Sequence, residues 1–566
     1  MKLNQARKLV IASAILCFAS SLGSTATAVT RVWNKTAGGT LSFTDVANWD
    51  DGSTSFPNGV DDIASMDTLD LAGTQTVTLN QSITLGELHL GDTGGGSGLS
   101  FPQNLSNSGG SGALVFQKSS GNAQLTFGNP SVNLRTNLNI NVPVRFNSDT
   151  EVSLALQSSG SRNLYFITGA LTGSGNMIIN SANRGTVAFF TDTYNLSSYT
   201  GTIKYTSNGT SGNFLQLAGN TVAGGARNLQ GTTLEMAVTT AGGNVSIFDA
   251  QDGAILELGA LRGDGLIVPF TNKASAAGAA FTDTLKTGYL PGTNNYSGVI
   301  SGTARFPFDA DPVTINYEKV GAISTQIFSG ANTYPGTTTV SGGTLLVNGT
   351  HTGGSQYTVN GVSSADYNGN GVVDSADYIV WRKDPNVHGG DPAGYTAWRQ
   401  EFGNGAGTLG GTGTISASVV VNPGGTLAPG ASVGTLSVGG ADIDGILRVE
   451  YDGNVDTIDK LAVSGDLDIS SAKVDFDNLA VASLNGGPHI IATYGTLTGA
   501  AFASVVDLPG GYTIDYNYLS ANQIALVPGA GGGVALESAA GVPEPTGLLL
   551  ASVAVMGFGA VTRRRS

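Results

Sequence analysis

The chain has 566 residues, of which 83 are glycine and only 12% are charged. Its formal net charge of −15 excludes nucleic acid as an expected partner, because a nucleic-acid-binding surface needs clustered positive charge. A hydrophobic content of 40% argues against global disorder, and the length allows either several domains or one extended array of repeats.

The first 28 residues have the pattern of a secretory signal peptide. A positively charged start and an apolar run over residues 9–22 precede a cleavage site with the small residues Ala26 and Ala28. The mature chain is therefore expected to begin at Val29 after export through the Sec pathway. An uncleaved anchor helix is the alternative, and the short apolar run disfavours it. Because Cys17 is the only cysteine, the mature chain is expected to lack disulfides.

Two tryptophans, Trp33 and Trp49, mark the start of the mature chain as the end of an array of stacked repeats. Such an end needs a cap, and two indole rings could cover its apolar surface. A platform on which sugar rings stack is the functional alternative. Together with Pro57 and Asp61-Asp62, the spacing resembles the first coil of many autotransporter-like bacterial surface proteins.

Between residues 65 and 320, short runs of strand-forming residues alternate with clusters of glycine, serine and asparagine. The run from Asn137 to Val144 alternates polar and apolar residues, as a half-buried strand does. A Tyr-x-Gly pattern recurs at Tyr199 and Tyr296, each followed by β-branched residues. The irregular spacing predicts coils of variable length, and no helix is expected here.

The stretch from Phe328 to Thr350 carries the clearest repeat. Two strand-forming runs, 337–340 and 344–347, are too short to bury an apolar face unless they stack on similar units. The stretch resembles the passenger-associated repeat of autotransporter-like bacterial β-helix proteins. The resemblance implies an all-β fold, a right-handed parallel β-solenoid (β-helix), in an exported protein. The matching residues are Asn332-Thr333-Tyr334, Gly336, Gly342-Gly343-Thr344-Leu345 and Asn348-Gly349.

The repeat pattern stops after Thr350 and resumes over 405–440, which predicts an insertion at a loop, over 363–403. Residues 366–377 read DYNGNGVVDSAD, the oxygen-rich spacing of a calcium loop with a glycine at its sharp turn. Val373 is expected to pair with the neighbouring loop or the core. A surface loop rich in Asx turns, without a metal, is the alternative. The expected ligands of one Ca²⁺ are Asp366, Asn368, Asn370, the carbonyl of Val372, Asp374 and Asp377.

The last loop position carries Asp377 in place of the usual EF-hand glutamate, which resembles the dockerin type of loop. The segment that follows is repeated from Asp391 onward, with alanine, tyrosine, tryptophan and arginine at the same spacing. The resemblance implies a small module of two matching helices with Trp381 and Trp398 in its core. Since no calcium loop precedes the second copy and Gly394 replaces its closing acid, a single calcium site is expected and a cohesin-type partner is not favoured.

Elsewhere, acidic and histidine side chains form no catalytic motif. The acidic residues between 442 and 459 lie beside glycine and asparagine, where aspartate commonly bonds its own backbone, although paired carboxylates could cleave glycosides. The four histidines are expected at the surface or in loops. No catalytic residue is assigned, and the chain is interpreted as a non-enzyme. The residues concerned are Asp442, Asp444, Asp452, Asp456, Asp459, His89, His351, His388 and His489.

The C-terminus carries a small-residue linker over 531–541 and a second targeting segment over 542–566. Its apolar run over 548–561 is shorter than the roughly 20 residues of an upright membrane span, and the arginines after it favour a cytoplasmic end. The segment resembles the PEP-CTERM sorting signal of certain Gram-negative bacteria. This implies a transient transmembrane helix, cleavage by an exosortase, and delivery to the surface; a plain tail anchor is the alternative. The signal residues are Pro543, Glu544, Pro545, Arg563, Arg564 and Arg565.

The sequence thus predicts a non-catalytic, exported scaffold or adhesin of the cell surface or extracellular matrix. Expected partners are an exosortase, exopolysaccharide and cell-surface proteins. A polysaccharide-cleaving lyase or glycoside hydrolase, by analogy of fold, and a cohesin-type docking protein are the alternatives. The expected parts are a signal peptide (1–28), solenoid with N-terminal cap (29–362), dockerin-like insertion (363–403), continued solenoid (404–530), linker (531–541) and sorting signal (542–566).

Overall fold

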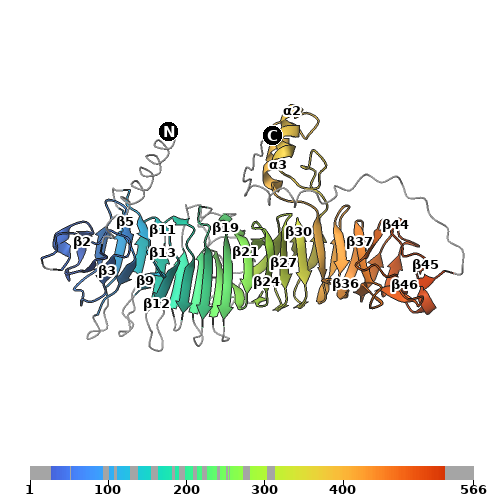
Figure 1. Ribbon diagram of the computed structural model, residues 1–566, viewed down its shortest axis with the longest axis horizontal. Coiled ribbons are helices and arrows are strands. Elements are labelled where there is room, and N and C mark those ends of the chain that lie inside the picture. Colours follow the sequence, from blue (N-terminus) through green and yellow to red (C-terminus); the bar gives the residue numbers. More distant parts are fainter. Residues whose placement is uncertain are drawn as a thin grey trace, which may run out of the picture.

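Figure 1 shows the computed structural model as an elongated body of stacked strands, from which a pair of helices projects on one side. Ala26 and the whole C-terminal sorting signal lie outside the described residues. None of the described helices is long and apolar enough to cross a membrane. The structure describes residues 27–50, 52–93, 101–107, 111–127, 138–154, 163–167, 169–181, 185–189, 198–207, 213–218, 226–238, 243–249, 253, 255–271, 281–302 and 313–529.

Strands form where buried and accessible residues alternate, because successive side chains point to opposite sides of a strand. In β30 (Gly343–Val347), Leu345 and Val347 are buried while the residue between them is partly exposed. This strand pairs in parallel with β27 (Ser324–Phe328), so that Phe328 aligns with Val347. Buried residues of successive strands therefore stack into one core. Each level of the stack is called a rung below.

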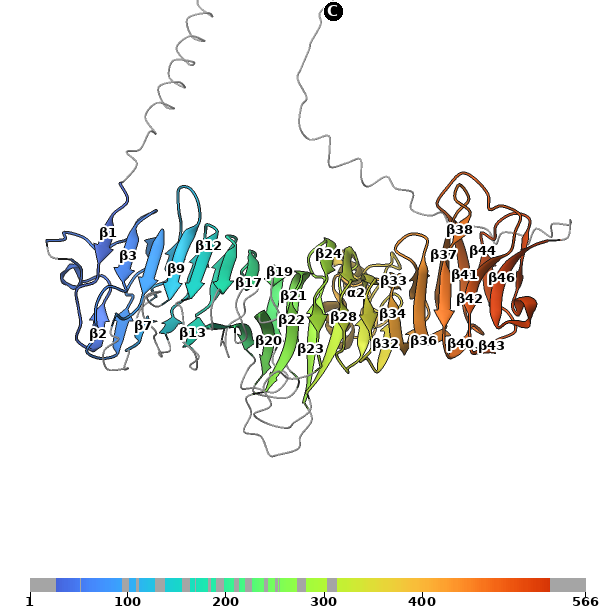
Figure 2. The same ribbon diagram turned by 90° about the horizontal axis from the view of Figure 1, so that it is seen from below.

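The described strands form three sheets in which almost all pairings are parallel, and the all-β prediction is confirmed at this level. Figure 2 shows the strands following one another along the long axis in sequence order. The main line of parallel pairings runs through β1 (Thr30–Val32), β3 (Ile63–Met66), β6 (Glu87–Leu90), β9 (Ala123–Phe127), β12 (Thr150–Leu154), β15 (Met177–Ser181), β17 (Thr202–Ser207), β19 (Ala226–Val238), β21 (Ile255–Gly263), β23 (Phe281–Thr287), β26 (Val313–Lys319), β29 (Thr338–Val340), β32 (Gln356–Val359), β34 (Thr414–Val421), β36 (Thr435–Ile443), β40 (Asp466–Asp468) and β43 (Thr496–Thr498).

The remaining elements complete the other faces of the stack. The same large sheet also contains β24 (Gly292–Tyr296), β27, β28 (Ala331–Asn332), β30, β31 (Thr350–His351), β33 (Gly407–Gly411), β35 (Thr426–Pro429), β37 (Ile446–Asp452), β38 (Thr457–Ile458), β39 (Lys460–Val463), β41 (Lys473–Asn478), β42 (His489–Thr493), β44 (Ser504–Val506), β45 (Tyr512–Asp515) and β46 (Gln523–Pro528). A second sheet contains β2 (Gly39–Ser42), β4 (Gln75–Thr78), β7 (Gln103–Ser106), β10 (Leu138–Asn141), β13 (Asn163–Ile167), β16 (Gly185–Phe189), β18 (Asn213–Ala218), β20 (Gly243–Asp249), β22 (Leu266–Thr271) and β25 (Val299–Ile300). The third contains β5 (Ile83–Leu85), β8 (Leu114–Phe116), β11 (Val144–Phe146) and β14 (Leu171–Gly173). The helices are α2 (Ser375–Lys383) and α3 (Ala393–Glu401), with short 3₁₀ segments η1 (Val46–Asn48) and η2 (Tyr518–Ser520).

Both ends of the stack are built differently from its middle. At the N-terminal end Trp33 and Trp49 pack edge to face, with ring centroids 5.1 Å apart, and Phe43 packs on Trp49. Both indole rings are only 1% exposed, so the alternative of a sugar-stacking platform is wrong and the tryptophans act as interior packing at this end. At the other end, β46 pairs antiparallel with β42 and β45. This reversal covers strand edges that a parallel stack would leave open.

The Tyr-x-Gly pattern has a physical cause. Tyr199 and Tyr296 are buried, and each hydroxyl donates to a carbonyl of the previous rung, Gly175 and Gly265, at 3.0 Å. The tyrosine ring therefore lies against the backbone of the glycine two residues later. A side chain at Gly298 would place its Cβ 2.6 Å from Cζ of Tyr296 and 2.2 Å from the Gly265 carbonyl oxygen. Glycine is required because the ring and the neighbouring rung already occupy that space.

His351 contradicts the expectation that every histidine lies at the surface or in a loop. It is buried, and its ring packs on that of Tyr334 at a tilt of 31°, with centroids 4.0 Å apart. Nε2 donates to the Tyr334 carbonyl at 2.9 Å, which leaves Nδ1 to accept from the Tyr357 hydroxyl at 2.7 Å. Satisfying both nitrogens allows a polar ring into the core, and burial lowers the pKa of His351. The other histidines are partly buried, on strands at His89 and His489 and in a loop at His388.

Replacing Gly298 with alanine is expected to lower the free energy of unfolding by about 1–3 kcal/mol, because overpacked interiors must distort to admit a methyl group. Denaturant unfolding followed by circular dichroism measures the change. Gly486→Ala is the matched control, since a Cβ there meets no atom within 4 Å. Equal stability of the two variants would contradict this account of the Tyr-x-Gly pattern.

Candidate functional site

The helical insertion leaves the stack after β32 and returns at β33. Strand pairing continues across it, because β30 pairs directly with β33 and aligns Gly343 with Gly407. Figure 1 shows α2 and α3 standing off the side of the body. The rungs are thus continuous beneath the insertion, which is added at a loop, where an array of this kind accepts extra residues.

The loop predicted to bind calcium closes around the carboxylate of Asp366. Its Oδ1 accepts from the backbone N–H groups of Gly369 and Asn370 at 2.8 and 3.1 Å, and its Oδ2 accepts from Gly371 at 2.7 Å. Gly369 and Gly371 have φ values of 72° and 89°, which favour glycine. The sharp turn expected at the sixth loop position is therefore present.

The end of the loop is joined to its beginning by Asp377. This buried carboxylate accepts from the backbone N–H groups of Asn368 at 2.9 Å and Asp374 at 2.7 Å. Asp374 in turn caps α2, accepting from the N–H of Ala376 at 2.6 Å. Residues 366–377 therefore form one closed loop that ends in the first turn of a helix.

The predicted ligands share this loop, but their acidic groups are not clustered. Among the residues that the structure describes, no group of three or more His, Cys, Asp or Glu side chains is arranged to hold a metal. The side-chain oxygens of Asn368 and Asn370 accept from the backbone of Asn370 and Val372 at 2.8 and 2.9 Å. Carboxylate, amide and carbonyl oxygens are the donors that a hard cation prefers. The donor set therefore fits Ca²⁺ in kind, while its side chains are bonded to the loop backbone.

The loop is tied to the body through Val373, as its predicted pairing with a neighbouring loop requires. Val373 donates to the Asn404 carbonyl at 2.8 Å and accepts from the Gly403 N–H at 2.7 Å. Gly403 accepts in turn from the N–H of Ala322 at 2.8 Å, and Asn404 Oδ1 accepts from Gly321 at 3.2 Å. A chain of hydrogen bonds thus leads from the loop, through the end of α3, to the strand body.

The two helices repeat each other in geometry as well as in sequence. Within α2, Tyr378 and Trp381 stack with centroids 5.8 Å apart, and within α3 Tyr395 and Trp398 stack at 5.7 Å. Across the pair, Tyr378 meets Trp398 at 4.9 Å and Trp381 meets Tyr395 at 5.5 Å. The rings form the core of the helical pair, as expected for both tryptophans.

Gly394 shows why the second copy differs. In the sequence repeat Gly394 corresponds to Asp377, and both residues lie in the first turn of their helices. A Cβ at Gly394 would lie 2.1 Å from the His388 carbonyl oxygen and 2.6 Å from Nε1 of Trp381. No acid can stand there, and α3 has no side-chain cap at its start. Close packing of the helical pair therefore excludes a second closing carboxylate.

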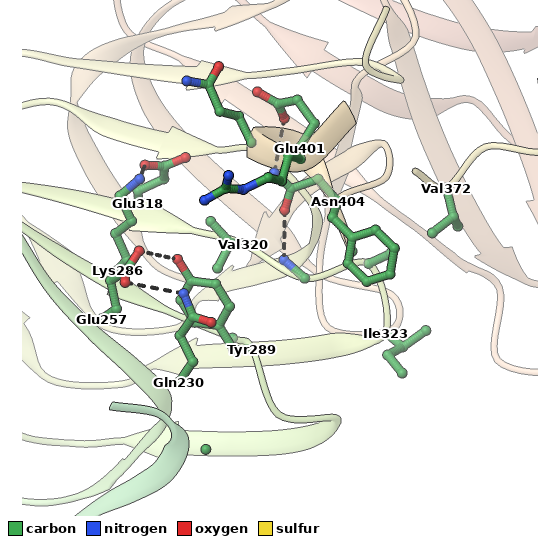
Figure 3. Close-up of a pocket in the computed structure, with 18 of the residues that line it drawn as sticks. Gln230, Glu257, Lys286, Tyr289, Glu318, Val320, Ile323, Val372, Glu401 and Asn404 are labelled. Atoms are coloured by element: carbon green, nitrogen blue, oxygen red, sulfur yellow. Dashed lines mark hydrogen bonds and ion pairs between the residues drawn. The ribbon is translucent and has the colours of Figure 1, made fainter. Parts of the chain in front are cut away.

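A cleft of about 1230 Å³ lies between α3 and the adjoining face of β21, β23 and β26. Its strand wall carries a charge ladder, in which Glu257, Lys286 and Glu318 occupy aligned positions on neighbouring strands. Figure 3 shows these side chains on one wall, with Glu401 and Asn404 on the opposite side. Lys286 Nζ lies 2.8 Å from Glu318 Oε2. The cleft thus has a charged wall formed by the strands and a facing wall formed by α3 and the residues after it.

Lys319 lies buried beside the foot of the insertion. Its Nζ donates to the carbonyls of Val320 and Gly342 at 2.6 and 3.0 Å and to Ser324 Oγ at 2.7 Å. Among the described side chains, no carboxylate lies within ion-pair distance of it. Burial lowers the pKa of Lys319 to about 7. The amine thus links Val320 to Gly342 of the next rung through their carbonyl oxygens. Gly321, which bonds Asn404, lies directly after Val320.

The acidic residues between 442 and 459 only partly match their expected role in turns. Asp452 accepts from the backbone N–H of Asn454 at 2.8 Å, two residues on, as turn residues do. Asp456 accepts from the N–H of Asn485 at 2.8 Å, in a segment distant in the sequence. Asp459 is instead buried, and it accepts from Gly434 and Glu450 at 2.7 and 2.9 Å. Burial raises its pKa to about 7. Asp442 lies on a strand beside the aligned Asp468, and burial with neighbouring Asp444 and Asp468 raises the pKa of Asp442.

Sequence reasoning missed the cleft, because its strand wall depends on pairing register. Glu257, Lys286 and Glu318 are separated by 29 and 32 residues, and only parallel alignment brings them together. A search for alternating charges at rung-sized intervals is the signal that could have found them. Compared with known proteins, the chain matches no family model, and no curated relative matches it significantly.

Proposed function

We propose that the chain is a non-catalytic, exported, right-handed parallel β-solenoid that serves as a structural or adhesive scaffold at the cell surface or in the extracellular matrix. The observation that carries this proposal is the continuous line of parallel pairings from β1 to β43. An array in which each rung contacts only its neighbours can extend without a larger core. Its aromatic N-terminal end and reversed C-terminal strands suit a molecule that must not polymerise through its ends.

The proposed route of export depends on the two terminal segments. A signal peptide cut after Ala28 would direct the chain through the Sec pathway of a Gram-negative-type bacterium. The PEP-CTERM-like segment would then hold the chain in the membrane until an exosortase cuts near Pro543-Glu544-Pro545. Both steps are supported by the order of charged, apolar and small residues in the sequence.

The insertion is proposed to hold one Ca²⁺ in residues 366–377. The cation would bind oxygens of Asp366, Asn368, Asn370, Val372, Asp374 and Asp377. It would supply positive charge to a loop that carries three carboxylates. The closed loop, the left-handed glycines and the oxygen-only donor set support this assignment.

The two alternative functions have less support in the geometry. A dockerin pair has a loop before each helix, whereas α3 begins at Ala393 and the preceding Pro392 provides no side-chain cap. A glycoside hydrolase needs two carboxylates facing each other across the scissile bond. In the cleft, Lys286 lies between Glu257 and Glu318 on the intervening strand and pairs with Glu318. Glu401, on the opposite side, accepts a hydrogen bond from Asn404 Nδ2 at 3.0 Å. Every carboxylate of the cleft is therefore already bonded to a protein group. The scaffold therefore remains the function proposed.

Export is tested by replacing Glu544 with alanine in the producing cells. We expect the variant to stay in the membrane fraction with residues 542–566 attached, because the proposed exosortase recognises the Pro-Glu-Pro motif. Mass spectrometry of the membrane and extracellular fractions measures this. Glu537→Ala, in the linker, is the matched control and should be released normally. Release of processed Glu544→Ala in native amounts would refute the sorting proposal.

Calcium binding is tested by calorimetry on the mature chain. We expect one binding event per chain, and its loss in Asp366→Ala, which removes the carboxylate around which the loop closes. Asp391→Ala is the matched control, because it removes an aspartate of the second copy, the counterpart of Asp374, that lies outside the loop. Absence of a calcium heat in the native chain, or an unchanged heat in Asp366→Ala, would show that the loop is only a turn.

A further inference from the structure

The strand wall of the cleft presents acceptors in fixed positions. Glu257 accepts from the Tyr289 hydroxyl at 2.8 Å and from Gln230 Nε2 at 3.1 Å. Glu318 accepts from Ser341 Oγ at 2.8 Å and pairs with Lys286. Figure 3 shows Gln230, Tyr289 and the ladder gathered on this wall. A carboxylate can accept about four hydrogen bonds, so each held carboxylate keeps capacity for a ligand.

The facing wall offers complementary groups. Thr396, Arg399 and Gln400 line the cleft from α3 and are exposed. The Thr396 hydroxyl donates to the Pro392 carbonyl at 2.9 Å, so its oxygen is left to accept from a ligand. The cleft is also lined by two accessible apolar side chains. Phe402 is 54% exposed and Ile323 is 77% exposed. The Phe402 ring is held by an edge-on contact with Trp398, with centroids 5.2 Å apart. Exposed apolar groups beside ordered polar groups mark a recognition surface better than either kind alone.

We propose that this cleft binds a segment of a neutral polysaccharide. Sugar rings present hydroxyl groups that both donate and accept, which suits carboxylates, amides and a guanidinium held in place. They also present apolar C–H faces, which suit Phe402 and Ile323. This proposal names the class of ligand that the adhesive scaffold would bind. It rests on the proposed function for the biological role of binding, whereas the binding itself is argued from the cleft.

The volume and the net charge of the cleft indicate which polysaccharides it would bind. At about 1230 Å³, the cleft exceeds the ~300–1,000 Å³ of common small-molecule pockets, so it has room for several linked sugar units. Three glutamates line it against Lys286 and Arg399, which leaves one net negative charge. Uronic acid chains would therefore be repelled, whereas uncharged glycans would not. Glu257 and Glu318 are two strands apart, about 10 Å, with Lys286 between them. Glu401, on the opposite side, is bonded to Asn404 at 3.0 Å. Because all three carboxylates are held by protein groups, the arrangement favours binding without cleavage.

The test uses the mature chain on an array of neutral β-glucan, xylan, mannan, galactan and α-glucan oligosaccharides, with polygalacturonate and alginate as acidic probes. We expect retention on at least one neutral glycan and on neither acidic one. Calorimetry with the retained oligosaccharide should then show at least about tenfold weaker binding for Glu257→Ala and for Ile323→Ser. Ile323 is mostly exposed, so its variant should fold even if Glu257→Ala does not.

Glu235→Ala is the matched control. Glu235 belongs to a second ladder, between Lys204 and Arg262 on neighbouring strands of the same sheet, and it does not line the cleft. Its variant should bind the glycan like the native chain. Retention of no neutral glycan, retention of acidic glycans alone, or native affinity in folded Glu257→Ala and Ile323→Ser would overturn the proposal. Each of these results would leave export and calcium binding untouched.

Discussion

Parallel pairing in register between neighbouring rungs is the constraint on which the rest of this structure depends. A strand such as β30, with five residues, can bury Leu345 and Val347 only because β27 and β33 lie on either side of it. The same pairing supplies partners for its backbone, which would otherwise need water or another chain. Glycine is placed where one rung must approach the next closely, as Gly298 approaches the Gly265 carbonyl. Residues between strands are less constrained, and the insertion occupies such a place.

Register also explains how charged groups far apart in the chain form surfaces. Glu257, Lys286 and Glu318 form one ladder, and Lys204, Glu235 and Arg262 form another, because each occupies the same position in successive strands. Alternating signs offset the repulsion that identical residues would suffer at this spacing. The first ladder becomes part of a cleft because α3 stands opposite it. The proposed glycan site is therefore a property of the insertion and the rungs together.

Features that depend on residues close together in the sequence could be predicted, whereas features that depend on distant residues were missed. Alternation predicted the strands, and the sharp turn at Gly371 followed from its loop position. The repeat that begins again at Asp391, with the resemblance it carries, predicted two matching helices around Trp381 and Trp398. Burial of His351 was missed, because it requires Tyr334 and Tyr357 on both sides of the ring. The buried positions of Lys319 and Asp459 were missed for a related reason. Their hydrogen-bond partners come from neighbouring rungs. A short polar stretch of sequence has the same pattern whether its side chains are buried in the stack or exposed to solvent.

The most direct test of the stacking is small-angle X-ray scattering from the chain without its terminal targeting segments. The line from β1 to β43 contains 17 strands and 16 steps, which at about 4.8 Å each gives about 77 Å before the ends are added. We predict a skewed distance distribution with a long tail that reaches beyond this length. A symmetric distribution ending near the roughly 60 Å diameter of a globule of about 500 residues would contradict the account.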